Sequence, residues 1–341
     1  MSTHIDYVDT RIAPERTLRA MHRLYLVWDE ELIPGDPPVP IEQRIVDWRN
    51  PYATESVPQW AMWEGSEVVA ISGVSMDLAQ NLENAVGWVY VHPDARGRGL
   101  GREIAAPMLD VAEEDGRIRI AFGVIEGRPE ETLAERAGLR AAYREQLNRL
   151  SFQEVDWSLM ESWTERASER ASEYELLYLP SPMPEEHLEA FCELALVMNT
   201  APKEDFEEED ELMTPEIWRD IEAKEGRRAF DILTYVARHR PTGDFAGFTT
   251  AVYHRMRPDL VWQMETAVDP THRDRGLGRW VKAAMALKIR SEYPSVKRIE
   301  TFNAGSNEPM LSINVEMGFR PVFTQTMWQG DLAVLRENLS V

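Results

Sequence analysis

The sequence is poor in cysteine and has no long apolar run. Cys192 is the single cysteine among 341 residues, so no intrachain disulfide can form and a reducing, cytoplasmic setting is expected. Cys192 also falls in a helical apolar stripe, which predicts a buried thiol and not a nucleophile. No apolar stretch approaches the roughly 18 residues that span a membrane, and the first residues lack the basic and apolar segments of a secretory signal. We expect a cytoplasmic protein with no membrane partner.

Basic residues are also scarce. The chain has 37 Lys and Arg against 59 Asp and Glu, a formal net charge of −22. Such a charge argues against nucleic acid and anionic lipid as partners. An anionic ligand must therefore be held by a local basic cluster. The length predicts two domains, and an apolar content of 43% suffices for two cores.

One short pattern occurs twice, in residues 91–102 and 268–279, and the two copies align without a gap. Each copy runs from an apolar strand through a Pro turn into Arg-x-x-Gly-x-Gly and then an amphipathic helix. Glycines let the backbone bend and approach a ligand, and the first amides of a helix have no internal partner. This order predicts an anion site fit for a pyrophosphate. The alternative, a plain Gly-rich turn with solvated arginines, is disfavoured by the second copy.

The residues expected to bind the anion end the strand, form the turn or open the helix. In the first copy they are Val91, Arg96, Arg98, Gly99, Gly101 and Arg102, and in the second Val268, Arg273, Arg275, Gly276, Leu277, Gly278 and Arg279. Lys282 extends the basic cluster of the second copy.

The pattern resembles the signature of the GNAT superfamily of N-acetyltransferases, in which the amides after a strand hold the pyrophosphate of acetyl-CoA. The resemblance continues in residues 298–303, 307–310, 313–314 and 318–319, which look like the family's fifth strand and fourth helix, and more weakly in residues 118–139. It implies an α/β (α+β) fold of two tandem GNAT-type domains, each a mixed, mostly antiparallel twisted sheet flanked by helices. The architecture is similar to that of the mycothiol synthase family, although no residue reads as specific for mycothiol. Acetyl-CoA is the implied acyl donor, with coenzyme A as product.

Periodicity divides the chain into a first domain (1–156), a polar linker (157–174) and a second domain (175–341). The predicted helices are 14–30, 40–49, 99–115, 129–137, 184–200, 215–225, 276–292 and 307–317. The predicted strands are 58–63, 67–74, 85–91, 117–124, 140–155, 230–239, 245–254, 261–268, 296–302 and 320–330.

Acetyl transfer to an alkylamine needs a base. An alkylammonium with a pKa of about 10.4 is neutral only about once in 2,500 molecules at pH 7. Glu265 lies in the strand that enters the second motif, where alternation places it on one face with Gln263 and Ala267. Apolar neighbours would raise its pKa by desolvation, which suits a base, and the resemblance implies a glutamate on this strand. A surface glutamate without a role is the alternative.

The two copies differ at the expected catalytic positions. Trp88 aligns with Glu265, and Gly123 and Gly127 stand where the second copy has Asn303 and Asn307. Asn303 is a candidate catalytic residue and Asn307 a candidate cofactor ligand, each able to bond the pantetheine arm or the acceptor; a helix cap at Asn307 is equally consistent. We expect the second domain to be catalytic, while the first binds coenzyme A without turnover or only shapes the acceptor cleft.

One position departs from the family pattern. Asn314 stands where the resemblance implies a tyrosine general acid. Tyr253 or a water replaces it, or no acid is needed, since a thiol of pKa about 8.5 leaves readily as thiolate.

The acidic run 204–211 lies between two predicted helices of the second domain. It either attracts a cationic amine or is a solvated loop, and the second reading is favoured. We expect a monomer or homodimer, without metal, that acetylates a primary amine of a small molecule, either cationic or neutral. The alternative is an inactive acyl-CoA-binding regulatory protein.

Overall fold

The computed structural model describes residues 2–340 and divides the chain into two compact units. The first unit comprises Met1–Arg144, Glu204–Glu209 and Thr324–Val341, and the second comprises Glu145–Lys203 and Asp210–Phe323. The division therefore differs from the predicted ranges 1–156 and 175–341, because each half of the chain contributes segments to both units.

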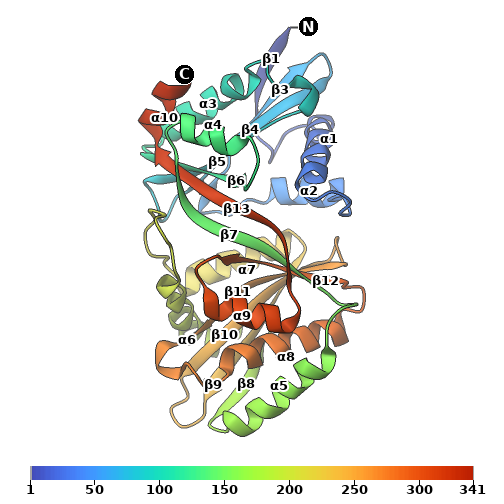
Figure 1. Cartoon of the computed structure of the whole chain (residues 1–341), viewed down its shortest axis with the longest axis vertical. Helices are drawn as coiled ribbons and strands as arrows, with labels where there is room; N and C mark the ends of the chain where they lie inside the picture. The colour runs from blue at the N-terminus through green and yellow to red at the C-terminus, as the bar shows by residue number, and fades with distance from the viewer. Residues whose placement is uncertain (1, 341) are drawn as a thin grey trace. The chain divides into compact units, whose positions relative to one another are not determined.

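The first unit is a twisted sheet with helices on it (Figure 1). The strands run in the order β1-β3-β4-β5-β6-β13, and β5–β6 is the parallel pair while the other pairs in this order are antiparallel. The elements that begin in this half are β1 (Thr3–Val8), α1 (Glu15–Leu32), α2 (Ile41–Arg49), β2 (Glu55–Ser56), β3 (Gln59–Glu64), β4 (Glu67–Asp77), β5 (Asn84–Val91), α3 (Leu100–Glu114), β6 (Arg119–Ile125), α4 (Glu130–Arg136) and β7 (Arg140–Ser151).

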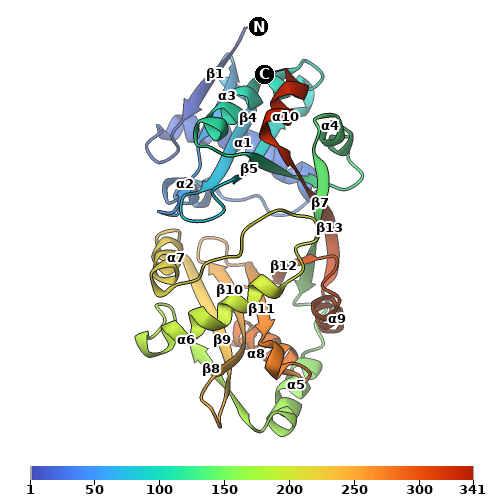
Figure 2. The same cartoon turned by 90° about the vertical axis from the view of Figure 1, so that its left-hand side faces the viewer.

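The second unit repeats this plan, with strands in the order β7-β12-β11-β10-β9-β8 and β11–β12 as the parallel pair. Helices α6 and α7 cover one face and α8 covers the other (Figure 2). The elements of the second half of the chain are α5 (Trp157–Arg170), β8 (Tyr174–Leu179), α6 (Glu185–Ala195), α7 (Pro215–Arg227), β9 (Phe230–His239), β10 (Phe245–His254), β11 (Leu260–Val268), α8 (Leu277–Glu292), β12 (Arg298–Ala304), α9 (Glu308–Met317), β13 (Arg320–Asp331) and α10 (Leu332–Leu339). Of these, α10 and β13 from Thr324 onward belong to the first unit.

The last strand of each unit comes from the other half of the chain. The end of β7 pairs with β12 in the second unit, where Asn148 lies opposite Thr301. The end of β13 pairs with β6 in the first unit, where Trp328 lies opposite Phe122. Leu150 of β7 is fully buried in the core of the second unit, and Trp328 is buried in that of the first. Each core is thus completed by a reciprocal strand exchange.

The predicted fold class is confirmed, but the predicted linker is wrong. Residues 157–170 form helix α5, begun by the Asp156 carboxylate, which accepts from the amides of Ser158 and Leu159. Met160 and Trp163 pack into the core that α8 covers. Strands β1 and β8 and helix α10 were not predicted. None of the helices within residues 2–340 is long and apolar enough to cross a membrane.

The acidic run is an irregular segment whose carboxylates are exposed, as favoured from the sequence, but it does not belong to the second unit throughout. Residues 204–209 belong to the first unit, where the Gln329 side chain donates to the carbonyl of Glu207 at 3.0 Å and accepts from its amide at 2.9 Å. The Glu207 carboxylate pairs with Arg119 and Arg140. This segment is held by backbone and charge pairing, so its carboxylates are partly neutralised.

We predict that substitutions in the exchanged strands destabilise the unit that receives the strand. Leu150→Ala should cost about 2–5 kcal/mol and should speed amide hydrogen exchange in β11 and β12. Trp328→Ala should speed exchange in β5 and β6. Leu133, which is exposed, provides the control Leu133→Ala with little effect. Faster exchange in β5 and β6 from Leu150→Ala, with β11 and β12 unchanged, would contradict the exchange.

Candidate active site

Both glycine motifs have the same backbone conformation. A short 3₁₀ turn follows each strand, and the motif then has two residues with positive φ, Gly97 (74°) and Gly99 (80°) in the first unit and Asp274 (63°) and Gly276 (81°) in the second. Helices α3 and α8 begin at the next residue. Only glycine adopts this region without strain, which explains Gly99 and Gly276.

The turn in each unit fits a pyrophosphate. A Cβ built at Gly99 or Gly276 would meet no atom within 4 Å, so the backbone there faces open space. The first amides of α3 and α8 point toward the same space, as at any helix start. Arg96 and Arg273 hold the turns alike, because each Nε donates to the last carbonyl of the preceding strand, at 3.1 Å to Val91 and 3.2 Å to Val268. These residues, with Gly101 and Gly278, form what we call the amide nest of each unit.

Carboxylates neutralise the arginines of the first nest. Arg96 pairs with Glu31 at 2.6 Å, and the Tyr90 hydroxyl donates to the same carboxylate at 2.5 Å. Arg98 pairs with Glu64 at 3.0 Å and lowers the pKa of that carboxyl. Two of the three arginines of the first motif are thus paired and Arg102 is left exposed, so the positive charge available to an anion at this nest is reduced, although its backbone is intact.

The second nest keeps more of its charge. The second guanidinium arm of Arg273 meets the Thr200 hydroxyl at 3.4 Å, and no carboxylate of the described residues lies within 4 Å. Arg275 is 3.7 Å from Glu173 and lies over the Tyr174 ring. The Tyr174 hydroxyl and the His272 Nδ1 are 2.7 Å apart, which ties the turn to β8. Arg273 and Arg275 are therefore less closely paired with carboxylates than Arg96 and Arg98 are.

The remaining basic residues of the motifs differ in their exposure and pairing. Arg102 is exposed, whereas Arg279 pairs with Glu316 at 2.5 Å and lies over Trp163. Lys282 does not extend the basic cluster as predicted, because it is only 1% exposed and lies over the Phe319 ring. Burial lowers the pKa of Lys282 to about 7.

The parallel strands part beside each nest. β11 and β12 pair over three residues each, and the last pair is Trp262 with Glu300, although both strands continue beyond it. β5 and β6 likewise pair over three residues each, and their last pair is Val86 with Ala121. The inner edges beyond these points have backbone donors and acceptors without a ladder partner, which a ligand with amide groups can satisfy.

A bulge in the second unit changes the direction of Glu265. Thr249 pairs with Thr266 and Ala251 with Gln263, so one residue of β10 faces two of β11. The bulge ends the alternation, and Gln263 is buried while Glu265 is exposed. The predicted shared face and desolvation of Glu265 are therefore wrong. The Thr250 hydroxyl, which the sequence did not single out, donates to the Glu265 carboxylate at 2.6 Å.

Asn303 belongs to a cluster of buried amides on the other face of the sheet. Its Oδ1 accepts from Asn314 at 2.7 Å and from Asn148 at 3.4 Å. Asn314 is 1% exposed, and its Oδ1 has no hydrogen-bond partner among the described residues. Glu265 shares a face with Thr250, and Asn303 shares one with Asn314, so the structure brings the two catalytic candidates to the same strand gap from opposite sides. Asn148 was missed because strand exchange has no sequence signal.

The contacts of two further candidates are local, and the prediction that Asn307 binds the cofactor stays a prediction. Asn307 caps α9, since its Oδ1 accepts from the Met310 amide at 3.3 Å. Tyr253 packs on Tyr293 with centroids 4.5 Å apart, and its partner Val261 belongs to the core under α8. Tyr253 therefore lies on the face opposite Glu265 and does not replace the general acid. The first unit has no bulge in its β4–β5 ladder, and the Trp88 indole lies over Gly73.

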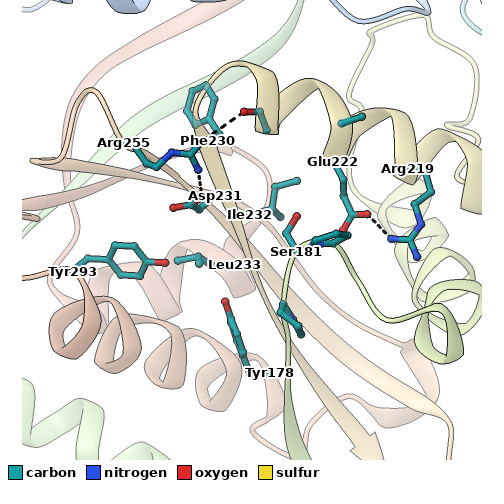
Figure 3. A pocket seen from close by; sticks show the side chains of 14 residues that line it. Tyr178, Ser181, Arg219, Glu222, Phe230, Asp231, Ile232, Leu233, Arg255 and Tyr293 are labelled. Atoms are coloured by element: carbon teal, nitrogen blue, oxygen red, sulfur yellow. Dashed lines mark hydrogen bonds and ion pairs between the residues drawn. The ribbon is translucent and has the colours of Figure 1, made fainter.

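A cavity of about 580 Å³ lies elsewhere in the second unit, lined by β8, α7, β9 and Tyr293. Figure 3 shows that its charged side chains are paired with one another: Arg219 with Glu222 and Arg255 with Asp231. It contains no residue of the nest and none of the catalytic candidates, so it is not the site of this chemistry. Cys192 is buried with a pKa raised to about 11 by burial, as a core thiol is.

The buried Lys282 predicts a pH dependence of stability. Its pKa is about 7 when folded and about 10.4 when unfolded, so between these values the unfolded chain binds more protons and stability rises with pH. Lys282→Met removes this term. We expect the stability advantage of Lys282→Met to shrink by roughly 1.4 kcal/mol per pH unit from pH 7 to 9, as measured by urea unfolding. A constant difference across that range would contradict it.

Comparisons with known proteins agree with this geometry. The family model described as acetyltransferase (GNAT) family matches residues 21–136. A search of curated protein sequences returned no significant match. A tandem GNAT protein from the clavulanic acid biosynthesis pathway, solved without acetyl-CoA, is 20% identical over 97% of this chain and 99% of its own, with a TM-score of 0.78. A GCN5-related N-acetyltransferase from Sphaerobacter thermophilus is 14% identical over 96% of each chain, with a TM-score of 0.68.

The family match covers most of the first unit, and the structural likeness covers both units and nearly the whole length of each relative. The chain thus carries an acetyltransferase domain of the GNAT family and has the fold of a tandem GNAT protein.

Proposed function

We propose that the protein transfers the acetyl group of acetyl-CoA to a primary amine of a small molecule, and that the second unit performs the reaction. The observation that carries the proposal is one continuous site in that unit. An amide nest whose Arg273 has no ion-pair partner among the described residues lies at the end of β11, the strand that also carries Glu265 at the edge of a strand gap. The first unit has the nest and the gap but has Trp88 in place of the carboxylate.

The residues present suit direct transfer. Acetyl-CoA supplies an activated thioester, with its pyrophosphate on the nest amides and Arg273. Glu265 accepts a proton from the ammonium, directly or through water, and the neutral nitrogen then attacks the thioester carbonyl. The C–N bond forms and the C–S bond breaks, coenzyme A leaves as thiolate, and the nitrogen gives up its second proton to water, which leaves the neutral amide. The Thr250 hydroxyl donates to the Glu265 carboxylate and thereby orients it.

The mechanism needs no general acid. Asn314 occupies the position of the family's tyrosine, is buried and donates to Asn303, and an amide does not release a proton. A thiol of pKa about 8.5 leaves without protonation near neutral pH.

A regulatory acyl-CoA-binding protein is the second candidate. The neutralised first nest and the missing tyrosine favour it, as does the family match, which falls on the first unit and not on the second. The two candidates differ in one measurement, the release of free thiol from acetyl-CoA in the presence of a broad set of amines.

We predict that the two nests differ in affinity for acetyl-CoA. Gly276→Val and Gly99→Val introduce the same strain, because both residues have φ near 80° and open space around the missing Cβ. In calorimetry, Gly276→Val should abolish tight binding of acetyl-CoA, and Gly99→Val should leave most of it in a chain that circular dichroism shows to be folded. Equal losses in the two folded variants would refute the assignment to the second unit.

Turnover should depend on the Glu265 carboxylate. Glu265→Gln keeps its size and removes its basicity, so turnover of an alkylamine should fall by roughly 10²–10⁴ with acetyl-CoA affinity unchanged. An arylamine, already neutral at pH 7, should be affected far less. Glu308→Gln, an exposed glutamate at the start of α9, is the matched control. Wild-type turnover in Glu265→Gln would assign the base to another group.

A further inference from the structure

An aromatic group lies at the strand gap of the second unit and takes no part in the mechanism above. The Trp262 and Phe302 rings are parallel, with an interplanar angle of 3° and centroids 6.1 Å apart. The Phe323 ring meets Phe302 edge-on, with centroids 6.0 Å apart. We call these three residues the aromatic shelf. All three belong to the second unit.

The shelf is on the same face of the sheet as Glu265. Trp262 pairs with Val252 of β10 and with Glu300 of β12. Because side chains alternate along a strand, Val252 shares a face with Thr250, and Glu300 shares a face with Phe302. Thr250 in turn donates to the Glu265 carboxylate. Glu265 and the aromatic shelf therefore lie on the same face of the sheet, beside the strand gap between β11 and β12.

The shelf is open to solvent. Phe302 is 37% exposed, and Met264, between Trp262 and Glu265, is 46% exposed. The inward side of this face is packed by α6 and α7 over β9 and β10, whereas the exposed shelf lies on β11, β12 and β13. Large exposed apolar side chains beside a candidate base indicate a ligand surface.

We propose that the acceptor is an arylalkylamine, a primary ammonium on a short alkyl chain that ends in a flat ring; this inference rests on the proposed function. Charge complementarity places the ammonium at the Glu265 carboxylate. The ring of the amine then packs on Trp262 and Phe302. Trp262 lies three residues before Glu265 on β11, a separation on the order of 10 Å between backbone positions, and Phe302 lies on the neighbouring strand β12. Ring faces bind flat apolar groups and not hydrated polyamine chains.

The competing acceptor, a polycation drawn by the acidic run, has less support. Glu207 is paired with Arg119 and Arg140, and Lys203 binds Asp210 at 3.0 Å. Residues 204–209 pack in the first unit. A run whose carboxylates are partly paired offers less to a polyamine than its composition suggests.

The test compares 2-phenylethylamine with cadaverine, an aliphatic diamine of similar length, as acceptors of the full-length protein. We expect 2-phenylethylamine to have the higher kcat/KM. Phe302→Ala should raise its KM roughly tenfold with little change in kcat, and the KM for acetyl-CoA should stay as in the wild type. Phe302→Tyr, which keeps the ring, should restore the wild-type KM. Tyr7→Ala removes an exposed ring that packs edge-on against the buried Trp60 in the first unit and should change neither constant.

A second readout separates this inference from the proposed function. Calorimetry of 2-phenylethylamine with the coenzyme A complex should give an affinity that Phe302→Ala weakens by the same factor. If amines are acetylated without preference and Phe302→Ala has no effect, the shelf is structural and the inference is overturned while the function stands. If no amine is acetylated, the proposed function fails; the shelf inference then fails too unless Phe302→Ala still weakens binding.

Discussion

The parting of β11 and β12 is the constraint on which the chemistry of the second unit depends. The two strands pair for three residues and then diverge, which leaves backbone donors and acceptors without ladder partners. Such groups must be satisfied by water or a ligand. The bulge opposite Thr250 lies in the same stretch of β11 and sets the direction of Glu265. The nest then begins where β11 ends. The strand gap, the proposed base Glu265 and the proposed anion site therefore follow one another along β11 and the turn after it.

The nests of the two units have the same backbone conformation and different charged surroundings. Their nests share φ angles, 3₁₀ turns and the arginine that holds the strand end. They differ in what surrounds them: Glu31 and Glu64 in the first unit, Thr200 and a distant Glu173 in the second. An anion that binds the first nest must compete with carboxylates already in place. Because of the reciprocal strand exchange, each unit needs a strand from the other half of the chain to complete its core.

Much of the fold was readable in the sequence, because apolar periodicity and glycine positions are local signals. The turn at Gly276 and the helix from Leu277 follow from the residues themselves. Helix α5 was read as a linker because its exposed face is densely charged, although Met160, Trp163 and Ala167 recur at helical spacing and are buried. The exchange of β7 and β13 was not predictable, because alternation shows that a strand has a buried face and not which sheet receives it.

The residues of the nest could be predicted from the sequence, whereas the directions and contacts of the candidate catalytic side chains could not. Glu265 was identified on its strand, but an even alternation was assumed, and a bulge adds a residue that no local pattern announces. Asn303 was expected to face the substrate, yet its acceptor oxygen is taken by Asn314 and by Asn148 from the other half of the chain. Its role as a catalytic residue stays a prediction, as does the choice of the second unit.

The central claim is that the second nest alone binds acetyl-CoA tightly. The stoichiometry of acetyl-CoA binding to the wild-type chain tests it most directly, by calorimetry at a protein concentration well above Kd. The account predicts one tight site per chain, with any second event much weaker because Glu31 and Glu64 already occupy the first nest's arginines. Two equivalent tight sites per chain would contradict it.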